Sequence, residues 1–283
     1  MLVTGDYILS RASEGNYAVG AFNTSNLEIT KAIIEAAEEM NSPVIIQTSQ
    51  GAIKYAGLKN LGSIVRKMAE DASVPVALHL DHGTDFNVIM GCLRDGWSSI
   101  MIDGSKHEFE KNVEVTAEIT KIAGAMGVSV EAEIGKIGGQ EEHIVVDERE
   151  ASMTDPAEAV EFVKLTNCDS LAIGVGTAHG PYKGEPKLDF DRIETIKGLL
   201  KMPLVLHGCS GVPEKDVVKA VSLGINKINI DTDLRQAFAK ATREFLDSDA
   251  NEYDPRKILT PGMNAMKEVV KTKIKMCGSE NKA

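Results

Sequence analysis

Short runs of apolar and β-branched residues alternate with amphipathic helical segments along almost the whole chain. Strands that are apolar at nearly every position and alternate with helices are typical of a parallel sheet buried on both faces. No G-x-G-x-x-G motif follows the first run, and eight units favour a closed barrel over an open sheet. The sequence therefore predicts an α/β fold, a (β/α)₈ TIM barrel. The eight expected strands are Tyr17–Phe22, Val44–Thr48, Val76–Leu80, Ser99–Ile102, Val128–Glu133, Ser170–Val175, Leu204–His207 and Lys227–Ile230.

Length and composition agree with one such barrel. The chain has 283 residues, 43% of them hydrophobic and 26% charged, which supplies both a large core and a polar surface. No linker or low-complexity tract divides it, so we expect a single domain over residues 1–283 that ends in C-terminal helices.

Charge and cysteine content exclude several classes of partner. The net charge is −11 and the isoelectric point is near 5.1, which argues against nucleic acid because a nucleic-acid surface needs a basic face. No apolar run approaches the roughly 20 residues that span a bilayer, and the first residues lack the layout of a signal peptide. We therefore expect a cytoplasmic protein with no membrane partner. The four cysteines form no C-x-x-C pair and are expected to be reduced.

One segment interrupts the alternation. Between Glu133 and Asp155 the chain runs IGKIGGQEEHIVVDEREASMT, far longer than the roughly 2–6 residues of a usual connection from strand to helix. It follows the fifth strand at its C-terminal end, where barrels place their active sites. We expect it to form a long mobile lid.

Three histidines lie at the C-terminal ends of expected strands. His82 ends HLDHG after the third strand, His179 lies in GTAHGPYKGEP after the sixth, and His207 lies in VLHGCSG at the end of the seventh. Any one of them could be a structural histidine, but all three converge on one rim of a barrel. Three imidazoles leave one zinc position open, as in catalytic sites. His79 shares a strand face with Asp81 and is expected to be buried and structural.

Two segments at the same rim are candidate anion sites. Gly208–Gly211 follows the seventh strand, and Asn229–Thr232 ends the eighth strand where a helix begins. The loops after strands 7 and 8 are the recurrent phosphate site of this barrel. Lys183 could add a cation there.

The chain resembles a known family at several distinctive places along its length. It carries AFNTSN, VIIQTSQGA, ALHLDHG, SIMIDGS, EAEIGKIGGQEE, GTAHGPYKGEP, VLHGCSG, INKINIDTD and YDPRKIL, in that order. These strings are similar to those of the class II fructose-bisphosphate aldolases. The resemblance implies reversible cleavage of fructose 1,6-bisphosphate to dihydroxyacetone phosphate and glyceraldehyde 3-phosphate, through a zinc-stabilised enediolate, in glycolysis and gluconeogenesis.

The resemblance also implies roles for individual residues. Zinc would bind His82, His179 and His207, and Asp81 would handle the proton of the carbon-4 hydroxyl. Glu141 would move the proton at carbon 3. Two acidic residues would offer an alternative or neighbouring metal position, namely Asp103 and Glu133.

Substrate contacts follow from the same resemblance. A monovalent cation, Na⁺ or K⁺, would assist phosphate binding, and Asn229 would touch the carbon chain. The far phosphate would meet Asn23, Ser49 and Arg256, with the arginine supplied by a neighbouring subunit of a homodimer or homotetramer. The phosphate of the dihydroxyacetone half would lie on Gly180, Lys183, Gly208, Ser210, Asp231 and Thr232.

Alternatives remain open at this point. Tagatose-1,6-bisphosphate aldolases share the class, although in family terms Asp231 favours fructose, since the tagatose enzymes tend to have alanine there. A zinc hydrolase could use the same histidines but would not need two phosphate sites. A non-catalytic sugar-phosphate sensor would need neither Asp81 nor Glu141. A lysine Schiff base is disfavoured because Lys227 is expected to begin its strand rather than end one.

Overall fold

Eight parallel strands close into a barrel in the computed structural model of the chain, which confirms the predicted TIM barrel. The structure describes residues 1–141, 144–146, 152–180 and 186–283, with the backbone alone for residues 140, 141 and 144–146. Around the barrel, the strands follow the order β1, β11, β10, β8, β5, β4, β3, β2. Their bounds are β1 (Val19–Asn23), β2 (Val44–Ser49), β3 (Val76–Gly83), β4 (Ser99–Ile102), β5 (Ser129–Ile134), β8 (Ser170–Ile173), β10 (Leu204–Leu206) and β11 (Ile225–Ile230).

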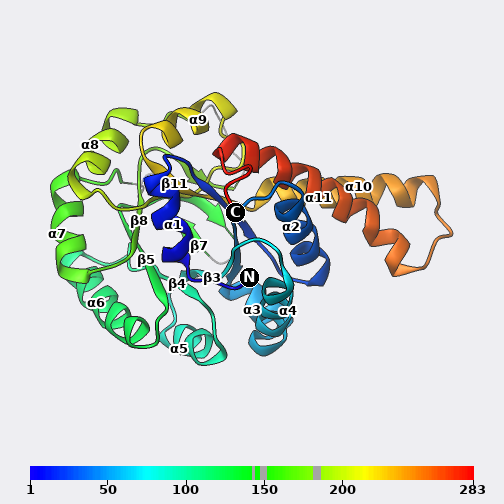
Figure 1. Cartoon of the computed structure of the whole chain (residues 1–283), viewed down its shortest axis with the longest axis horizontal. Helices are drawn as coiled ribbons and strands as arrows, with labels where there is room; N and C mark the ends of the chain where they lie inside the picture. The colour runs from blue at the N-terminus through cyan, green and yellow to red at the C-terminus, as the bar shows by residue number, and fades with distance from the viewer. Residues whose placement is uncertain (142–143, 147–151, 181–185) are drawn as a thin grey trace.

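Helices cover the outside of the barrel (Figure 1). Several of these helices begin after a polar residue whose side chain accepts hydrogen bonds from the first backbone amides. Asp155, for example, accepts hydrogen bonds from the amides of Ala157 and Glu158, as its position before Pro156 predicts. The helices are α1 (Gly5–Glu14), α2 (Leu27–Glu39), α3 (Gln50–Ala56), α4 (Leu58–Asp71), α5 (Phe86–Asp95), α6 (Phe109–Ala125), α7 (Pro156–Thr166), α8 (Phe190–Leu200), α9 (Glu214–Ser222), α10 (Thr232–Ser248) and α11 (Pro255–Cys277).

Most strand ends differ slightly from the prediction, and two differences affect the site. β4 has the predicted bounds, but β3 extends three residues further, to Gly83. β11 begins at Ile225 rather than Lys227, so the expectation that Lys227 begins its strand is wrong. Lys227 is instead the third residue of β11 and is fully buried.

Strand alternation separates two hydrophobic layers. In β3, Val76, Leu78 and Leu80 face outward and pack in the main core beneath the helices, whereas Ala77 belongs to a smaller cluster inside the barrel. That inner cluster includes α1, which contributes Ile8 and contacts the first residues of the strands. In Figure 1, α1 accordingly lies across the barrel. It fills the N-terminal end, which leaves the C-terminal rim for polar chemistry.

The long segment after β5 contains secondary structure of its own. It forms β6 (Gly138–Glu141) and β7 (Ile144–Val146), which pair antiparallel. β6 also pairs in parallel with β9 (Ala178–His179), so the segment meets the strand that carries one of the three candidate metal ligands. A small three-stranded sheet therefore joins the predicted lid to the metal site.

The predicted C-terminal helices are present. α10 and α11 form a hairpin that projects from the barrel (Figure 1). The two helices pack against each other, and α11 also packs against α2. Across residues 1–141, 144–146, 152–180 and 186–283, no helix combines the length and hydropathy of a membrane span.

Candidate active site

The three predicted metal ligands come together at the C-terminal rim. His82 is the penultimate residue of β3, His179 ends β9 and His207 follows β10. All three side chains are buried, and their candidate ligand atoms lie within 4.8 Å of one another. The ring centroids of His82 and His207 are 4.7 Å apart and those of His82 and His179 are 5.0 Å apart. Three converging imidazoles are the ligand set of a catalytic zinc site.

The backbone of His82 is bent to make this possible. In an unbroken strand, Asp81 and His82 would point to opposite sides of the sheet. Here the register between β3 and β4 shifts between Leu80 and Gly83, and His82 adopts a φ of 45°. A non-glycine residue in this region costs on the order of 1–3 kcal/mol and is typical of functional sites. The irregularity allows both side chains to face the site.

Buried carboxylates determine which histidine nitrogens face one another. The Nδ1 atom of His82 lies 2.9 Å from Oδ2 of Asp103, and Nε2 of His207 lies 2.9 Å from Oε1 of Glu131. An ionised carboxylate only accepts, so these nitrogens carry the protons. The opposite nitrogens, Nε2 of His82 and Nδ1 of His207, are 3.0 Å apart. Two lone pairs at this distance would repel, so either a proton on Nε2 of His82 or a metal cation beside both nitrogens is needed.

The electrostatics of the cluster also favour a cation. Burial on its own would lower the pKa of His82, but the negative charges of Asp81, Asp103 and Glu133 raise that pKa well above its usual value. Burial and the charge of Asp103 raise the pKa of Glu133 well above its usual range. The Oε2 atom of Glu133 has no hydrogen-bond partner among the residues that the structure describes. A divalent cation on the histidines would neutralise this cluster, so the donor set fits a metal.

A second possible ligand group overlaps the first. His82, Asp103 and Glu133 also offer three ligand atoms within 4.8 Å of one another. The structure thus brings both predicted acidic residues to the predicted histidines. Cys209 is not in either group; its sulfur lies 3.6 Å from the carbonyl oxygen of Leu206.

Three amides hold the carboxylate of Asp81 beside the histidines. Oδ2 accepts hydrogen bonds from Asn23 at 2.9 Å and Gln47 at 3.3 Å, and Oδ1 accepts one from Asn229 at 3.2 Å. Burial on its own would raise the pKa of Asp81, but positive charge at His82 and the Asn23 hydrogen bond hold that pKa below its usual value. Asp81 is therefore an oriented, ionised acceptor.

The two predicted anion segments lie next to this cluster. Gly208 has a φ of 66°, and a Cβ atom there would lie 2.4 Å from the carbonyl oxygen of Ala178, so only glycine fits. Ser210 accepts a hydrogen bond from the amide of Asp233 in the first turn of α10. Asp231 is the N-cap residue of that helix and Thr232 its first residue. The amides at the start of α10 and the turn after β10 thus adjoin the histidines.

The structure brings only some of the remaining predicted residues to the site. Asn23 and Ser49 end β1 and β2, and Ser49 pairs in register with Asp81. Lys183 lies outside the residues that the structure describes. Glu141 ends β6, but the structure describes only its backbone. Arg256 is not brought to the site within one chain. Its exposed side chain pairs with Asp254 at the start of α11.

Sequence reasoning missed three buried polar residues of the barrel interior. Gln47 donates to both Asn23 and Asp81. Lys227 and Glu131 form an ion pair at 2.7 Å. A signal existed, because each is a polar residue within a predicted buried strand and shares its strand face with a predicted site residue two positions away. His79 is buried beside this pair, as predicted.

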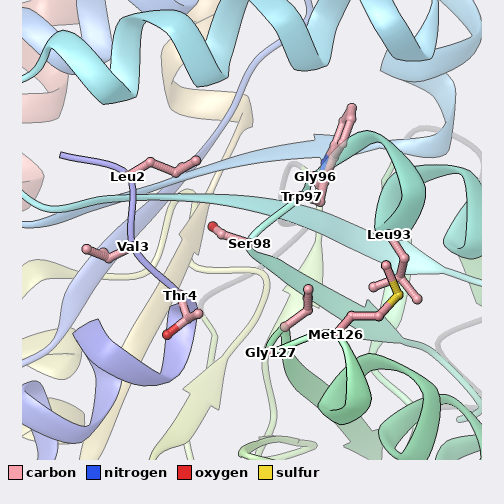
Figure 2. Close-up of a pocket in the computed structure, with 10 residues that line it drawn as sticks. Leu2, Val3, Thr4, Leu93, Gly96, Trp97, Ser98, Met126 and Gly127 are labelled. Atoms are coloured by element: carbon pink, nitrogen blue, oxygen red, sulfur yellow. The ribbon is translucent and has the colours of Figure 1, made fainter.

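A cavity at the other end of the barrel is unrelated to this cluster. It has a volume of about 300 Å³ and lies between the N-terminal segment and the turns that precede β4 and β5 (Figure 2). Trp97, Ser98 and Val128 line it just before those strands begin. Its position at the N-terminal end separates it from the histidines at the C-terminal rim.

Known proteins agree with this arrangement. A family model described as "Fructose-bisphosphate aldolase class-II" matches residues 3–282. The chain is 48% identical over 285 residues to the fructose-bisphosphate aldolase of Geobacillus stearothermophilus, with 100% of this chain and 99% of that protein covered. The chain belongs to the class-II fructose-bisphosphate aldolase family. It is therefore a metal-dependent aldehyde-lyase, and the family implies a divalent metal and a sugar-phosphate substrate.

Two further proteins are similar to the chain over nearly its whole length. The sulfofructosephosphate aldolase of Alkalicoccus urumqiensis is 46% identical over 281 residues, with 99% of this chain and 98% of that protein covered. The crystal structure of the YdjI aldolase from Escherichia coli K12 superimposes with a TM-score of 0.89 at 36% identity and covers all of both chains. The chain is thus similar over its whole length to aldolases that are named for different substrates.

Proposed function

We propose that this aldolase reversibly cleaves fructose 1,6-bisphosphate to dihydroxyacetone phosphate and glyceraldehyde 3-phosphate. The observation that carries the proposal is the placement of Asp81 beside three converging histidines. Its carboxylate is held by Asn23 and Asn229, within the same buried cluster that His82 and His207 form. An oriented base next to a metal site is what cleavage of a β-hydroxy ketone needs.

His82, His179 and His207 would hold zinc, and Asp103 and Glu133 would offer the alternative position. Zinc bound there supplies a Lewis acid that withdraws electrons from the substrate's oxygen atoms. The support is chemical: three imidazoles suit zinc better than magnesium or calcium, which prefer oxygen ligands.

Asp81 would accept the proton of the carbon-4 hydroxyl. The electron pair of the O–H bond then forms the carbonyl of the departing aldehyde, and the bond between carbons 3 and 4 breaks with its electrons remaining on the ketone half. Glu141 would deliver a proton to carbon 3. Its position in β6, which pairs with the strand of His179, supports this role.

One phosphate would be bound where the turn after β10 meets the start of α10. Backbone amides and a helix N-terminus are the usual phosphate ligands of this barrel. Asn229 would touch the carbon chain, and a monovalent cation, Na⁺ or K⁺, would offset the charge. The residues concerned are Gly180, Lys183, Gly208, Ser210, Asp231 and Thr232.

The second phosphate would be bound by Asn23, Ser49 and a neighbour's Arg256. The exposure of Arg256, on a hairpin that projects from the barrel, supports its use between subunits (Figure 1). We therefore propose a homodimer or homotetramer, in which residues 1–283 of each chain form one domain.

Substrate choice is tested by direct comparison. Purified protein is assayed with fructose 1,6-bisphosphate, tagatose 1,6-bisphosphate and 6-deoxy-6-sulfofructose 1-phosphate, before and after chelation. Asp231 supports fructose over tagatose, so kcat/KM should be highest for the fructose ester and should vanish with chelator. A higher kcat/KM for either competitor, or full activity in metal-free protein, would reject the proposal.

A further inference from the structure

Four ionisable side chains, one of them the candidate metal ligand His207, meet inside the barrel. They come from different strands or strand ends: Glu131 from β5, Lys227 from β11, His79 from β3 and His207 from the turn after β10. None is more than 2% exposed. Burying an ion pair is expensive, and apolar residues of similar volume often give equal or greater stability. A role other than folding is therefore to be sought for the Glu131–Lys227 pair.

The carboxylate of Glu131 connects the lysine to a metal ligand. Its Oε2 atom lies 2.7 Å from Nζ of Lys227, and its Oε1 atom lies 2.9 Å from Nε2 of His207. Each oxygen thus has one donor, which fixes the plane of the carboxylate.

This contact determines the tautomer of His207. Because Glu131 accepts, Nε2 of His207 carries the proton, and Nδ1 presents its lone pair toward Nε2 of His82 at 3.0 Å. The amide nitrogen of Asn229 also lies 3.2 Å from Nε2 of His207, but it is a donor oriented by Asp81. Glu131 is therefore the acceptor that selects the metal-binding tautomer.

Lys227 keeps Glu131 in place. Nε2 of His79 lies 3.8 Å from Oε2 of Glu131 and 3.4 Å from Nζ of Lys227, while Nδ1 of His79 lies 2.8 Å from the hydroxyl of Ser99. With Lys227 present, the lysine donates to both Glu131 and His79. Without it, His79 could donate to Glu131 and draw the carboxylate away from His207.

We propose that Glu131 and Lys227 are positioning residues for metal binding, with Lys227 acting on His207 through Glu131. The inference rests on the proposed zinc site, but not on the identity of the sugar phosphate. Hydrogen bonds of this kind typically contribute 10–100-fold to metal affinity. On this proposal, the Glu131–Lys227 pair increases metal affinity, although burying it costs folding stability.

The test measures zinc affinity instead of turnover. Zinc dissociation constants are obtained by competition with a chromophoric chelator for the wild type, Glu131→Gln and Lys227→Met. Both variants are expected to bind zinc about 10–100-fold more weakly. In Glu131→Gln, the amide oxygen should turn to the lysine ammonium and leave its NH₂ group against His207, which favours the wrong tautomer.

The double variant provides a rescue. When Glu131→Gln is combined with Lys227→Met, the amide oxygen is free to accept from His207, so zinc affinity should recover in part relative to Glu131→Gln alone. The double variant also carries no buried charge at these two positions, so it remains testable if a single variant fails to fold. No loss of affinity in the folded single variants, or no recovery in the double variant, would overturn the proposal.

Lys197→Met is the matched control. Lys197 is a partly buried lysine with three hydrogen bonds, to Ser13, Met202 and Asn226, and it lies outside the metal cluster. Its loss should change the free energy of unfolding and leave zinc affinity unchanged. An equal loss of zinc affinity in this control would attribute the effect to general destabilisation and reject the proposal. Because zinc binding is measured without substrate, these outcomes are independent of which ketose is cleaved.

Discussion

Gly139 pairs in register with His179, so the segment after β5 and a candidate metal ligand share one small sheet. A Cβ atom on Gly139 would lie 2.2 Å from the carbonyl oxygen of His179, and the φ of Gly139 is 98°. Gly208, in the turn after β10, contacts the preceding residue of β9: a Cβ atom there would lie 2.4 Å from the carbonyl oxygen of Ala178. The backbone of residues 178–179 is therefore packed closely against Gly139 and Gly208, where a larger residue would not fit.

Replacement of Gly139 by alanine should therefore disturb the metal site. The side chain would have to displace the His179 backbone, and the backbone conformation itself is unfavourable by about 1–2 kcal/mol for an L-residue. We expect zinc affinity to fall about tenfold or more, measured by chelator competition. Gly198→Ala is the control, because nothing lies within 4 Å of a Cβ at that helical position. Unchanged zinc affinity in Gly139→Ala would contradict this coupling.

The barrel could be predicted from the sequence because its strands are apolar, short and separated by helical repeats. Ser99–Ile102 matches β4 at both ends. The three histidines could be placed at one rim because each follows a strand, and the C-terminal ends of parallel strands meet at that rim.

Local sequence patterns do not predict other features of the structure. The positive φ of His82 requires the register shift between β3 and β4. The N-cap of α2 is Asn26, whose side chain accepts from the amide of Ile29, although Ser25 has the spacing of a capping box with Glu28. The partner of Lys227 is Glu131, which lies 96 residues away. Only the closed barrel brings Lys227 and Glu131 together.

Chelation should remove activity if the histidine cluster binds the metal. We expect about one zinc per subunit, loss of turnover with EDTA and recovery with added zinc. His207→Ala should lose both metal and turnover, because it removes one of three ligands, while circular dichroism remains that of the barrel. His107→Ala, at an exposed histidine in the loop after β4, is the control and should retain both. Atomic absorption measures the metal content of each variant. Zinc retained by His207→Ala would contradict the proposed site.

Stability should depend on pH through Lys197. Burial lowers the pKa of Lys197 from 10.5 to about 8. Between these values the unfolded chain binds more protons than the folded chain, so this residue's contribution to stability rises with pH and is lost as pH falls through about 8. The free energy of unfolding of the wild type relative to Lys197→Met should therefore increase between pH 7.5 and 9.5. Urea titrations at both pH values measure it, and a constant difference would contradict the shift.

Asp81→Ala should separate catalysis from metal binding. The variant removes the proposed proton acceptor but none of the three histidines, so kcat should fall by about 10²–10⁴-fold, with zinc content nearly unchanged. Steady-state kinetics and metal analysis of the same preparation test this. A variant that kept its kcat and only raised KM would show that Asp81 binds substrate instead of moving a proton.

Glu141→Ala should slow proton exchange at the hydroxymethyl carbon of dihydroxyacetone phosphate. The backbone of β6 brings Glu141 two residues past Gly139, whose partner is the metal-ligand candidate His179. If Glu141 protonates carbon 3, the reverse step removes a proton from that carbon even when no aldehyde is present. Deuterium incorporation from D₂O, followed by NMR, measures this half-reaction alone.

We expect exchange to fall by about 10²–10⁴-fold while zinc affinity stays close to that of the wild type. Glu161→Ala, which removes an exposed glutamate of α7, should exchange normally. Exchange at the wild-type rate in Glu141→Ala would assign the base to another residue, and the adjacent Glu142 would then be tested by the same substitution.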